Sequence, residues 1–479
     1  MSCSDDFVDR EFNQDVIVSD LKTSNEVIAF TRGIYSSMRA TTYYGADFLA
    51  YSEIRSDEMY STLAGGYYQN VYNYTMLSND PYAVNTYNQI YTAIAKANIV
   101  IGTNISSLQG SDADRSNALF AQGQAYGLRA IGFFDAFRLY GQKYIPNGTL
   151  GIVLPIKYDP KAVMPRATIA ETEAQIEADF TKALQLMTAG VNFVGASNKT
   201  ELSINALKGM MSRYYLYKGD YAKVRSLTND LIGKYSVATQ DLHQVSFQFV
   251  MNGAAPNSIF ELAVGINSSL STGSYRQRLN QLGYGNIAVS ASAFDAYATN
   301  DIRKKLITVV GSGASAVRYL SNNNGTGKYT NTVGADNIKM LRYEEILLNG
   351  IEAELNGGDS TKALNYYKIL IANRLLPIPK KDAAGNPVLD ADGNPVMVSG
   401  EEQANAITSV NMTMLKTERM KELLGEGLRQ WDLRRWGATI ARPAGASTDP
   451  NLNAFPIPRG ETDLANSPIL PNPGYDNSK

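Results

Sequence analysis

The sequence has 479 residues, of which 44% are hydrophobic, and its 44 Lys and Arg against 46 Asp and Glu give a net charge of −2. A chain of this length can bury a large core without disulfides or metals. The charge balance gives no reason to expect nucleic-acid binding, which requires an excess of Lys and Arg, and no apolar run approaches the roughly 20 residues of a membrane-spanning helix.

The chain contains one cysteine, Cys3, and one histidine, His243. Disulfides and zinc sites built from Cys and His are therefore not expected, and a Cys-His or Ser-His-Asp mechanism would depend on His243 alone. Cys3 has two interpretations. It is a free thiol in a flexible tail, or it is the lipid-bearing residue of a bacterial lipoprotein, with Ser2 before it and residues 1–15 as a tether. No signal segment precedes it here, so the second interpretation requires prior removal of the signal.

Three amphipathic helices are predicted in the first half of the chain. Residues 85–101 carry apolar side chains at helical spacing, and residues 117–141 form a longer helix that stops at Gly141. Residues 168–187 begin with Thr168 and Glu171, the pattern of a capping box.

Two helix pairs and a last helix follow. Residues 203–232 break at Lys218-Gly219-Asp220, and residues 338–374 break at Gly357-Gly358-Asp359. A helix that ends in Gly-Asp and is followed by a second helix is typical of a tetratricopeptide unit. Because the two units are far apart, we expect a degenerate helical scaffold rather than a tandem array. The last helix is predicted over 411–437.

Two segments are predicted to be insertions into this scaffold. Residues 236–334 are rich in Gly, Ser, Asn and Tyr, with short apolar runs such as "SIFELAV", and indicate loops with a few strands. Residues 380–405 repeat Gly-Asn-Pro-Val and predict a small hairpin. The "DADGN" within it is similar to a calcium loop but lacks the downstream Glu, and turn chemistry explains it well enough.

Three sequence motifs carry a resemblance to a known family. The final helix fits the pattern E-R-x-x-E-L-x-x-E-G-x-R-x-x-D-L-x-R-W, "LRYEEILLNGIEAELNG" is similar to a second family helix, and "FPIPRGETDLANSPILPNPGY" is similar to the family's tail. Glu344, Ile351 and Pro471 depart from the usual residues. The chain thus resembles the SusD/RagB-like nutrient-binding outer-membrane lipoproteins. The final-helix matches are Glu418, Arg419, Glu422, Leu423, Glu426, Gly427, Arg429, Asp432, Leu433, Arg435 and Trp436.

The resemblance implies a fold and a function. Such proteins are mostly α-helical, with a tetratricopeptide-like helix-pair scaffold (the SusD-like α/α fold), and residues 16–479 would form one such domain with the insertions described above. The family is anchored to the outer membrane by an N-terminal lipid. Its members cap a SusC-like TonB-dependent transporter and load it with a nutrient, usually an oligosaccharide, or peptides in the RagB branch. They are not enzymes, and no cofactor, metal or nucleic acid is implied.

The only two tryptophans, Trp431 and Trp436, lie in the final-helix motif. Because the motif is shared by family members whatever their ligand, a structural role is favoured over a ligand platform. Met420, Leu424, Leu428 and Trp431 would form a core-facing stripe on one helix. Two ion pairs three residues apart, Glu426–Arg429 and Asp432–Arg435, would stabilise that helix. The residues assigned to this structural motif are Glu418, Arg419, Glu426, Arg429, Trp431, Asp432, Arg435 and Trp436.

The ligand platform is then expected among the 30 tyrosines. Sugar sites stack a C–H face on an aromatic ring and surround it with Asn, Asp and Arg. One Tyr-rich segment lies between Tyr43 and Tyr91, and a second cluster is "STGSYRQRLNQLGYGN", which includes Arg278 and Asn286. The candidate ligand residues are Arg55, Asp57, Tyr67, Tyr68, Asn70, Tyr72, Asn73, Tyr74, Asn79, Tyr275, Arg276 and Tyr284.

Other classes of function stay open at this point. A glycosidase would need paired carboxylates, and Asp57 and Glu58 qualify by type only. A scaffold or adhesin would use the helical repeats to hold a protein partner and would bind no small ligand. A peptide ligand also remains an alternative to an oligosaccharide.

Overall fold

The computed structural model describes residues 21–195, 197–322, 325 and 327–478, so Cys3 and the predicted tether lie outside the described residues. The fold is mostly α, as predicted. The helices are α1 (Ser24–Met38), α2 (Asp47–Ile54), α3 (Gln69–Tyr72), α4 (Pro81–Gly102), α5 (Asp112–Tyr140), α6 (Ile169–Ala189), α7 (Ile204–Lys218), α8 (Tyr221–Asn229), α9 (Gln240–His243), α10 (Tyr275–Leu279), α11 (Ala291–Asp295), α12 (Tyr343–Leu355), α13 (Ser360–Ala372), α14 (Gly400–Asn405), α15 (Met412–Leu423), α16 (Arg429–Arg435) and α17 (Arg459–Thr462).

The strands are short and pair two by two, all antiparallel. The pairs are β1 (Met59–Ser61) with β5 (Ile287–Val289), β2 (Leu150–Val153) with β3 (Arg166–Thr168), β4 (Ser258–Leu262) with β8 (Ile338–Arg342), β6 (Thr308–Val310) with β7 (Val317–Tyr319), and β9 (Ile378–Pro379) with β10 (Met397–Val398).

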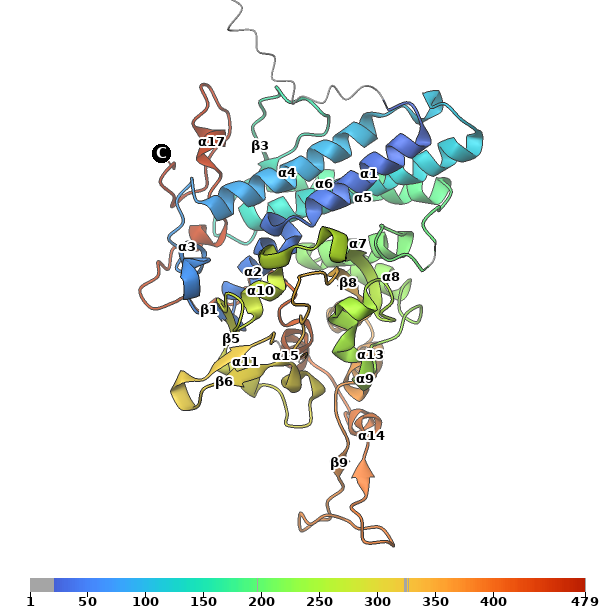
Figure 1. Cartoon of the computed structure of the whole chain (residues 1–479), viewed down its shortest axis with the longest axis vertical. Coiled ribbons are helices and arrows are strands. Elements are labelled where there is room, and N and C mark those ends of the chain that lie inside the picture. The colour runs from blue at the N-terminus through green and yellow to red at the C-terminus, as the bar shows by residue number, and fades with distance from the viewer. Residues whose placement is uncertain (1–20, 196, 323–324, 326, 479) are drawn as a thin grey trace, which may run out of the picture.

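The long helices α1, α4, α5 and α6 lie side by side in one layer (Figure 1). Their start sites are specified locally, because α1, α5 and α6 each begin with a capping box in which an N-cap hydroxyl and an acidic side chain three residues on satisfy each other's backbone N–H groups. The predicted helices over 85–101, 117–141 and 168–187 correspond to α4, α5 and α6. The second half of α5 is buried almost completely, so this helix forms the centre of the layer.

Two helix pairs continue the scaffold, as the Gly-Asp breaks predicted. Gly219 ends α7 with φ of 88°, a left-handed conformation that favours glycine, and Asp220 caps α8 by accepting a bond from the backbone N–H of Lys223. Asp359 caps α13 in the same way. Helix α12 packs on both α13 and α8, which joins the two pairs.

Two predicted boundaries in the second half differ from the structure. Residues 338–342 were expected to begin a helix, but they form β8, because this segment pairs with β4 inside the predicted "SIFELAV" strand. The segment 236–334 contains α9, α10, α11 and four short strands between loops. The predicted hairpin over 380–405 ends earlier, because residues 400–405 form α14 behind its own capping box.

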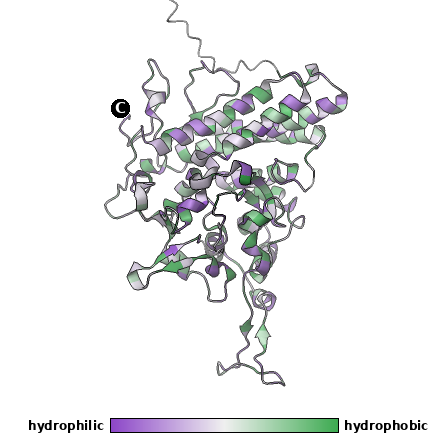
Figure 2. Cartoon of the chain, in the orientation of Figure 1, coloured by the Kyte–Doolittle hydropathy of each residue, from purple (hydrophilic) through white to green (hydrophobic). Residues whose placement is uncertain are grey.

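The hairpin projects from the body as an arm, at the bottom of Figure 1, and Figure 2 shows hydrophobic colouring on its short strands. Two successive tight turns shape its tip. Asp382 accepts bonds from the backbone N–H groups of Ala384 and Asn386, and Asp390 accepts from those of Asp392 and Asn394, all at 2.9 Å. One oxygen of each aspartate is therefore used by its own turn, which accounts for the "DADGN" sequence by turn chemistry.

The predicted single helix over 411–437 is wrong. Helix α15 ends at Leu423, α16 begins at Arg429, and the residues between form a turn. Gly425 and Gly427 both have φ of 76° there, a conformation that interrupts a helix. Their backbone N–H groups donate to the carboxylate of Glu53 on α2, at 3.1 and 2.5 Å, so a distant side chain holds the turn.

No helix in the described part of the chain is both long and apolar enough to cross a membrane.

Candidate functional site

The two Tyr clusters predicted from sequence meet in space. The rings of Tyr67, before α3, and Tyr284, between α10 and β5, lie 4.7 Å apart between centroids and are tilted by 40°. Pairing of β1 with β5 brings the two loops together, and the hydroxyl of Thr62 donates to the carbonyl of Gly285 at 2.8 Å. Both rings are half-buried and retain an exposed part. We call the rings of Tyr67 and Tyr284 the platform.

A guanidinium group lies against the platform. The Cζ atom of Arg278 is 4.5 Å from the ring centroid of Tyr67 and 4.9 Å from that of Tyr284. The Arg278 side chain is 7% exposed. The rings therefore cover the cation, and the cation fixes the rings from behind through cation–π contacts.

Tyr68, next to the platform, is fully buried and offers no stacking face. Its hydroxyl donates to Asp47 at 2.6 Å, and its backbone N–H donates to the hydroxyl of Tyr82 at 3.1 Å. Burial raises the pKa of Asp47 to about 6, against the opposing effects of Tyr68 and Arg278. This polar layer supports the segment that carries Tyr67.

Arg55 and Tyr74 are also buried. The Arg55 guanidinium lies 3.9 Å from the ring centroid of Tyr74, and Arg442 lies on the same ring at 4.0 Å. The Nη2 group of Arg55 donates to the carbonyl of Leu452. This stack joins the end of α2 to the C-terminal loop, and its burial leaves neither Arg55 nor Tyr74 open to a ligand in this conformation.

The remaining candidates of the first cluster are at the surface beside α3. Asn70 and Asn79 are exposed, Tyr72 and Asn73 are half-buried, and the Asn70 amide donates to Asp80 at 3.0 Å. These side chains could contact a ligand that extends beyond the platform.

Tyr275 and Arg276 of the second cluster are buried, and they line a cavity behind α10. Its volume of about 40 Å³ suits a few water molecules rather than a sugar. Burial raises the pKa of Asp336, another lining residue, to about 6.

The carboxylate pair considered for catalysis is occupied by other contacts. Asp57 accepts two bonds from Arg429, at 2.7 and 2.8 Å. Glu58 is 1% exposed and lies beside Glu53. Burial, together with the neighbouring Glu53 carboxylate, holds the pKa of Glu58 well above its usual range, and burial also raises the pKa of Glu53. Because Glu58 is buried and Asp57 is ion-paired with Arg429, the two carboxyl groups do not form an acid–base pair that a substrate can reach.

The Glu53–Glu58 pair predicts a pH-dependent stability. A carboxyl whose pKa is higher in the folded than in the unfolded state contributes fully below its ordinary pKa, near 4.5, and loses that contribution as the pH rises through the folded value. We expect Glu58→Gln to raise the free energy of unfolding by about 1–3 kcal/mol at pH 8, because the buried carboxyl must take up a proton or carry a charge at that pH and the amide does neither, and to change it little at pH 5. Urea denaturation at both pH values measures the difference.

The matched control for this comparison is Glu401→Gln on α14, where the side chain is exposed. If Glu58→Gln raises the free energy of unfolding equally at both pH values, or not at all at pH 8, the pKa of Glu58 is not raised in the folded protein.

The C-terminal motif, residues 418–436, is largely buried in a network of charges. The Glu422 carboxylate accepts from Arg342 at 2.6 Å and from Arg303 and Arg374 at 2.8 Å. Five cationic and five carboxylate side chains connect in this way, so their charges balance within the described residues. They are Arg303, Lys328, Arg342, Arg374, Lys421, Asp301, Glu344, Glu418, Glu422 and Glu426.

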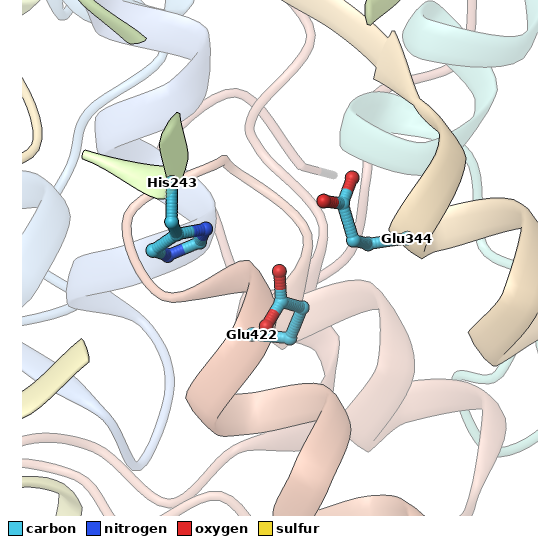
Figure 3. Close-up of side chains that lie close together, drawn as sticks. All are labelled: His243, Glu344 and Glu422. Carbon is cyan, nitrogen blue, oxygen red and sulfur yellow. The ribbon is translucent and has the colours of Figure 1, made fainter. Parts of the chain in front are cut away.

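His243, Glu344 and Glu422 lie close together inside this network (Figure 3), with ligand-type atoms within 4.8 Å of one another. The donor set does not suit a metal ion. Arg342 and Arg374 already contact both carboxylates, and a divalent cation would add uncompensated charge to a balanced cluster. Burial and Arg374 hold the pKa of His243 well below its usual range, so the imidazole is neutral.

The other motif residues pair with one another or with residues far away in the sequence. Arg419 donates to Asp432 at 2.6 Å, and Arg435 contacts both Asp432 at 2.9 Å and Glu352 of α12. The expected Asp432–Arg435 pair is present. The expected Glu426–Arg429 pair is not, because the turn separates the two side chains: Glu426 accepts from Arg342 and Lys328, and Arg429 donates to Asp57.

The two tryptophans differ in burial. Trp431 is 3% exposed, and its Nε1 group donates to the carbonyl of Gly427 at 3.1 Å. Trp436 is only half-buried, and its Nε1 group donates to Glu352 at 2.8 Å. Met420, Leu424 and Leu428 are buried with Trp431, although the turn prevents a continuous stripe on one helix. Neither tryptophan contributes to the platform.

Sequence reasoning missed the residues that hold the buried tyrosines beside the platform. Asp47 and Tyr82 hold Tyr68, and Arg442 covers Tyr74. No local motif marks these residues. The density of tyrosines between Tyr43 and Tyr91 was the only signal, and it does not separate exposed rings from buried ones.

Comparisons with known proteins bear on the family and the fold. A family model described as "Starch-binding associating with outer membrane" matches residues 6–216, and a model of the SusD family matches residues 311–469. No curated protein matches the sequence.

Similar solved structures span nearly the whole chain. A SusD superfamily protein from Bacteroides vulgatus has a TM-score of 0.77 at 23% identity, covering 95% of this chain and 100% of its own. A SusD superfamily protein from Bacteroides thetaiotaomicron has a TM-score of 0.74 at 22% identity, covering 94% and 100%. Surface glycan-binding protein A from Bacteroides fluxus has a TM-score of 0.69 at 19% identity, covering 95% and 100%.

Proposed function

The chain belongs to the SusD/RagB-like family, and on this premise we propose that it is a surface glycan-binding protein that stacks a sugar on the platform. The observation that carries the proposal is the pair formed by Tyr67 and Tyr284, two adjacent rings that keep an exposed part and are fixed by Arg278 from behind. Rings held in this way lose little freedom when a ligand binds, which favours affinity. The description of one family match as starch-binding supports the same ligand class.

The finer parts of the proposal concern delivery. The protein binds an oligosaccharide without cleaving it and passes it to a SusC-like TonB-dependent transporter in the outer membrane. Cys3 carries the lipid that anchors the native protein at the cell surface. The association with the outer membrane in the family description supports this location. A lipid anchor of this kind keeps the protein near the transporter and raises its effective concentration there. The intrinsic affinity between the two proteins therefore need not be high.

Alanine substitution of the platform tests the ligand site. We expect Tyr67→Ala and Tyr284→Ala each to weaken binding about fivefold, because one productive aromatic contact contributes about 1 kcal/mol, and the double variant to lose more. The melting temperature should fall less than after truncation of a fully buried ring, since both rings are half-buried, and it shows whether each variant is folded at the temperature of the titration. Isothermal titration against a panel of soluble oligosaccharides and peptides measures the affinities.

Tyr158→Ala is the matched control, because Tyr158 is 45% exposed and lies in a different loop. Parental affinity in the double variant would place the glycan site elsewhere. Binding of peptides but of no oligosaccharide would replace the glycan by a peptide ligand. Binding of neither class would leave a protein scaffold as the better function, and release of cleaved product would indicate an enzyme.

A further inference from the structure

Most of the deeply buried arginines among the described residues contact a carboxylate, but Arg278 does not, and in this it is similar to Arg55, whose Nε and Nη1 groups also lack a hydrogen-bond partner. Arg129, Arg213 and Arg374 each contact a carboxylate. Arg434 has no carboxylate but donates to three backbone carbonyls. Arg278 has no carboxylate at salt-bridge distance among the described residues, and its Nε and Nη1 groups are buried without a hydrogen-bond partner.

The surrounding groups do not neutralise this cation. The phenol groups of Tyr67 and Tyr68 interact with Arg278 and favour its charged form, and the rings of Tyr67, Tyr68 and Tyr284 lie against it, but none of the three carries a formal charge. Asp47 attracts Arg278 from a distance, but one of its oxygens already accepts the Tyr68 hydroxyl at 2.6 Å. A buried charge without a partner is costly, and a buried donor without an acceptor needs an explanation.

The position of Arg278 supplies the explanation. The guanidinium lies against both platform rings, so an acidic group on a sugar stacked there comes close to the cation. The ring of Tyr284 belongs to the loop 281–285, in which Leu282 is 72% exposed and Gly285 has φ of 58°. An acidic group reaches the unpartnered N–H groups only if the Tyr284 ring shifts with this surface loop.

Building on the proposed glycan site, we propose that the platform selects acidic sugars, whose carboxylate or sulfate group pairs with Arg278. Arginine is suited to this task, because its planar fork binds an oxyanion through two parallel hydrogen bonds. The low dielectric around a buried guanidinium strengthens the attraction compared with an exposed lysine. The shared ligand chemistry is an oxyanion on a sugar ring, and the experiment distinguishes uronates from sulfate esters.

Matched pairs of oligosaccharides test the proposal. Oligogalacturonides are compared with their carboxyl-reduced form, and chondroitin sulfate oligosaccharides with their desulfated form, each by isothermal titration. We expect the intact protein to bind the charged member of at least one pair about tenfold more tightly than its neutral counterpart. The pair that shows the preference identifies the oxyanion.

Arg278→Gln should reduce this preference to within about twofold. Loss of the cation that supports the rings should also weaken the neutral oligosaccharide, but by a smaller factor than the charged one. Arg278→Lys, which keeps the charge, should restore part of the preference. Arg32→Gln on α1, where the side chain is 58% exposed, is the control for the loss of one positive charge. Thermal melting of each variant shows whether the fold is intact.

Two outcomes would overturn the inference. If the intact protein binds both members of every pair equally, the platform takes sugars without regard to charge, and the proposed glycan function still stands. If Arg278→Gln weakens charged and neutral members by the same factor, Arg278 only supports the rings. Failure to bind any oligosaccharide would contradict the proposed function itself.

Discussion

Replacing Glu422 with alanine is expected to lower the free energy of unfolding by about 3–5 kcal/mol, the usual cost of removing one partner from a buried ion pair. The Glu422 side chain is 1% exposed and contacts three arginines, Arg303, Arg342 and Arg374. These cations come from three different parts of the chain, so the loss unbalances charge where water cannot enter. Burial alone would raise the pKa of Glu422, but Arg374 and Arg342 outweigh it and hold that pKa well below its usual range.

Urea denaturation at pH 7 measures this effect. Glu401→Ala on α14 is the matched control, because it removes an exposed carboxylate and should change stability by no more than about 0.5 kcal/mol. If the free energy of unfolding of Glu422→Ala lies within about 1 kcal/mol of the parent value, the buried network contributes little to the stability of the fold. The motif would then need another explanation, such as a contact with a partner protein.

The sequence predicted the elements whose signals are local. Thr168 and Glu171 begin α6 by a capping box, and Gly219 with Asp220 separates α7 from α8. Each of these signals acts within one turn of chain, so no tertiary information is needed. The mostly helical fold with paired helices followed from them.

The break between α15 and α16 was not predicted, although Gly425 and Gly427 lie in the sequence at that point. Helical spacing on both sides favoured one helix, and an isolated glycine is tolerated in a helix at a cost of about 1 kcal/mol. The deciding interaction is the carboxylate of Glu53, which binds the N–H groups of both glycines. A contact with residues so distant in sequence leaves no local signal.

The platform shows the same limit. Tyr67 and Tyr284 were both candidates, but in separate clusters, and their pairing depends on β1 and β5, which are only three residues long. Strands of that length show no readable alternation. Nor does sequence distinguish Tyr67 from Tyr68, although one ring is partly exposed and the other is fully buried.

Replacing Trp431 with alanine is expected to destabilise the fold by about 3–5 kcal/mol, because truncation of a buried tryptophan removes packing and leaves a cavity. The Trp431 ring is stacked on the ring of Phe48 of α2, with 6.2 Å between the centroids. The Cζ atom of Arg138 of α5 lies 5.2 Å from the Trp431 ring centroid. The Trp431 ring therefore joins the C-terminal motif to α2 and to the central helix of the layer. A half-buried ring has fewer packing contacts to lose, so Trp436→Ala should lower the free energy of unfolding by about half as much or less.

Thermal and urea denaturation of both variants measure these costs, and titration with a bound oligosaccharide at a temperature where both are folded measures ligand binding. We expect unchanged affinity, because neither indole lies at the platform formed by Tyr67 and Tyr284. Helix α2 carries both Phe48 and Glu53, so the motif would act on the proposed ligand site by fixing the helix that precedes it. A Trp431→Ala protein that melts like the parent yet loses its ligand would reverse this assignment and make the indole part of the binding surface.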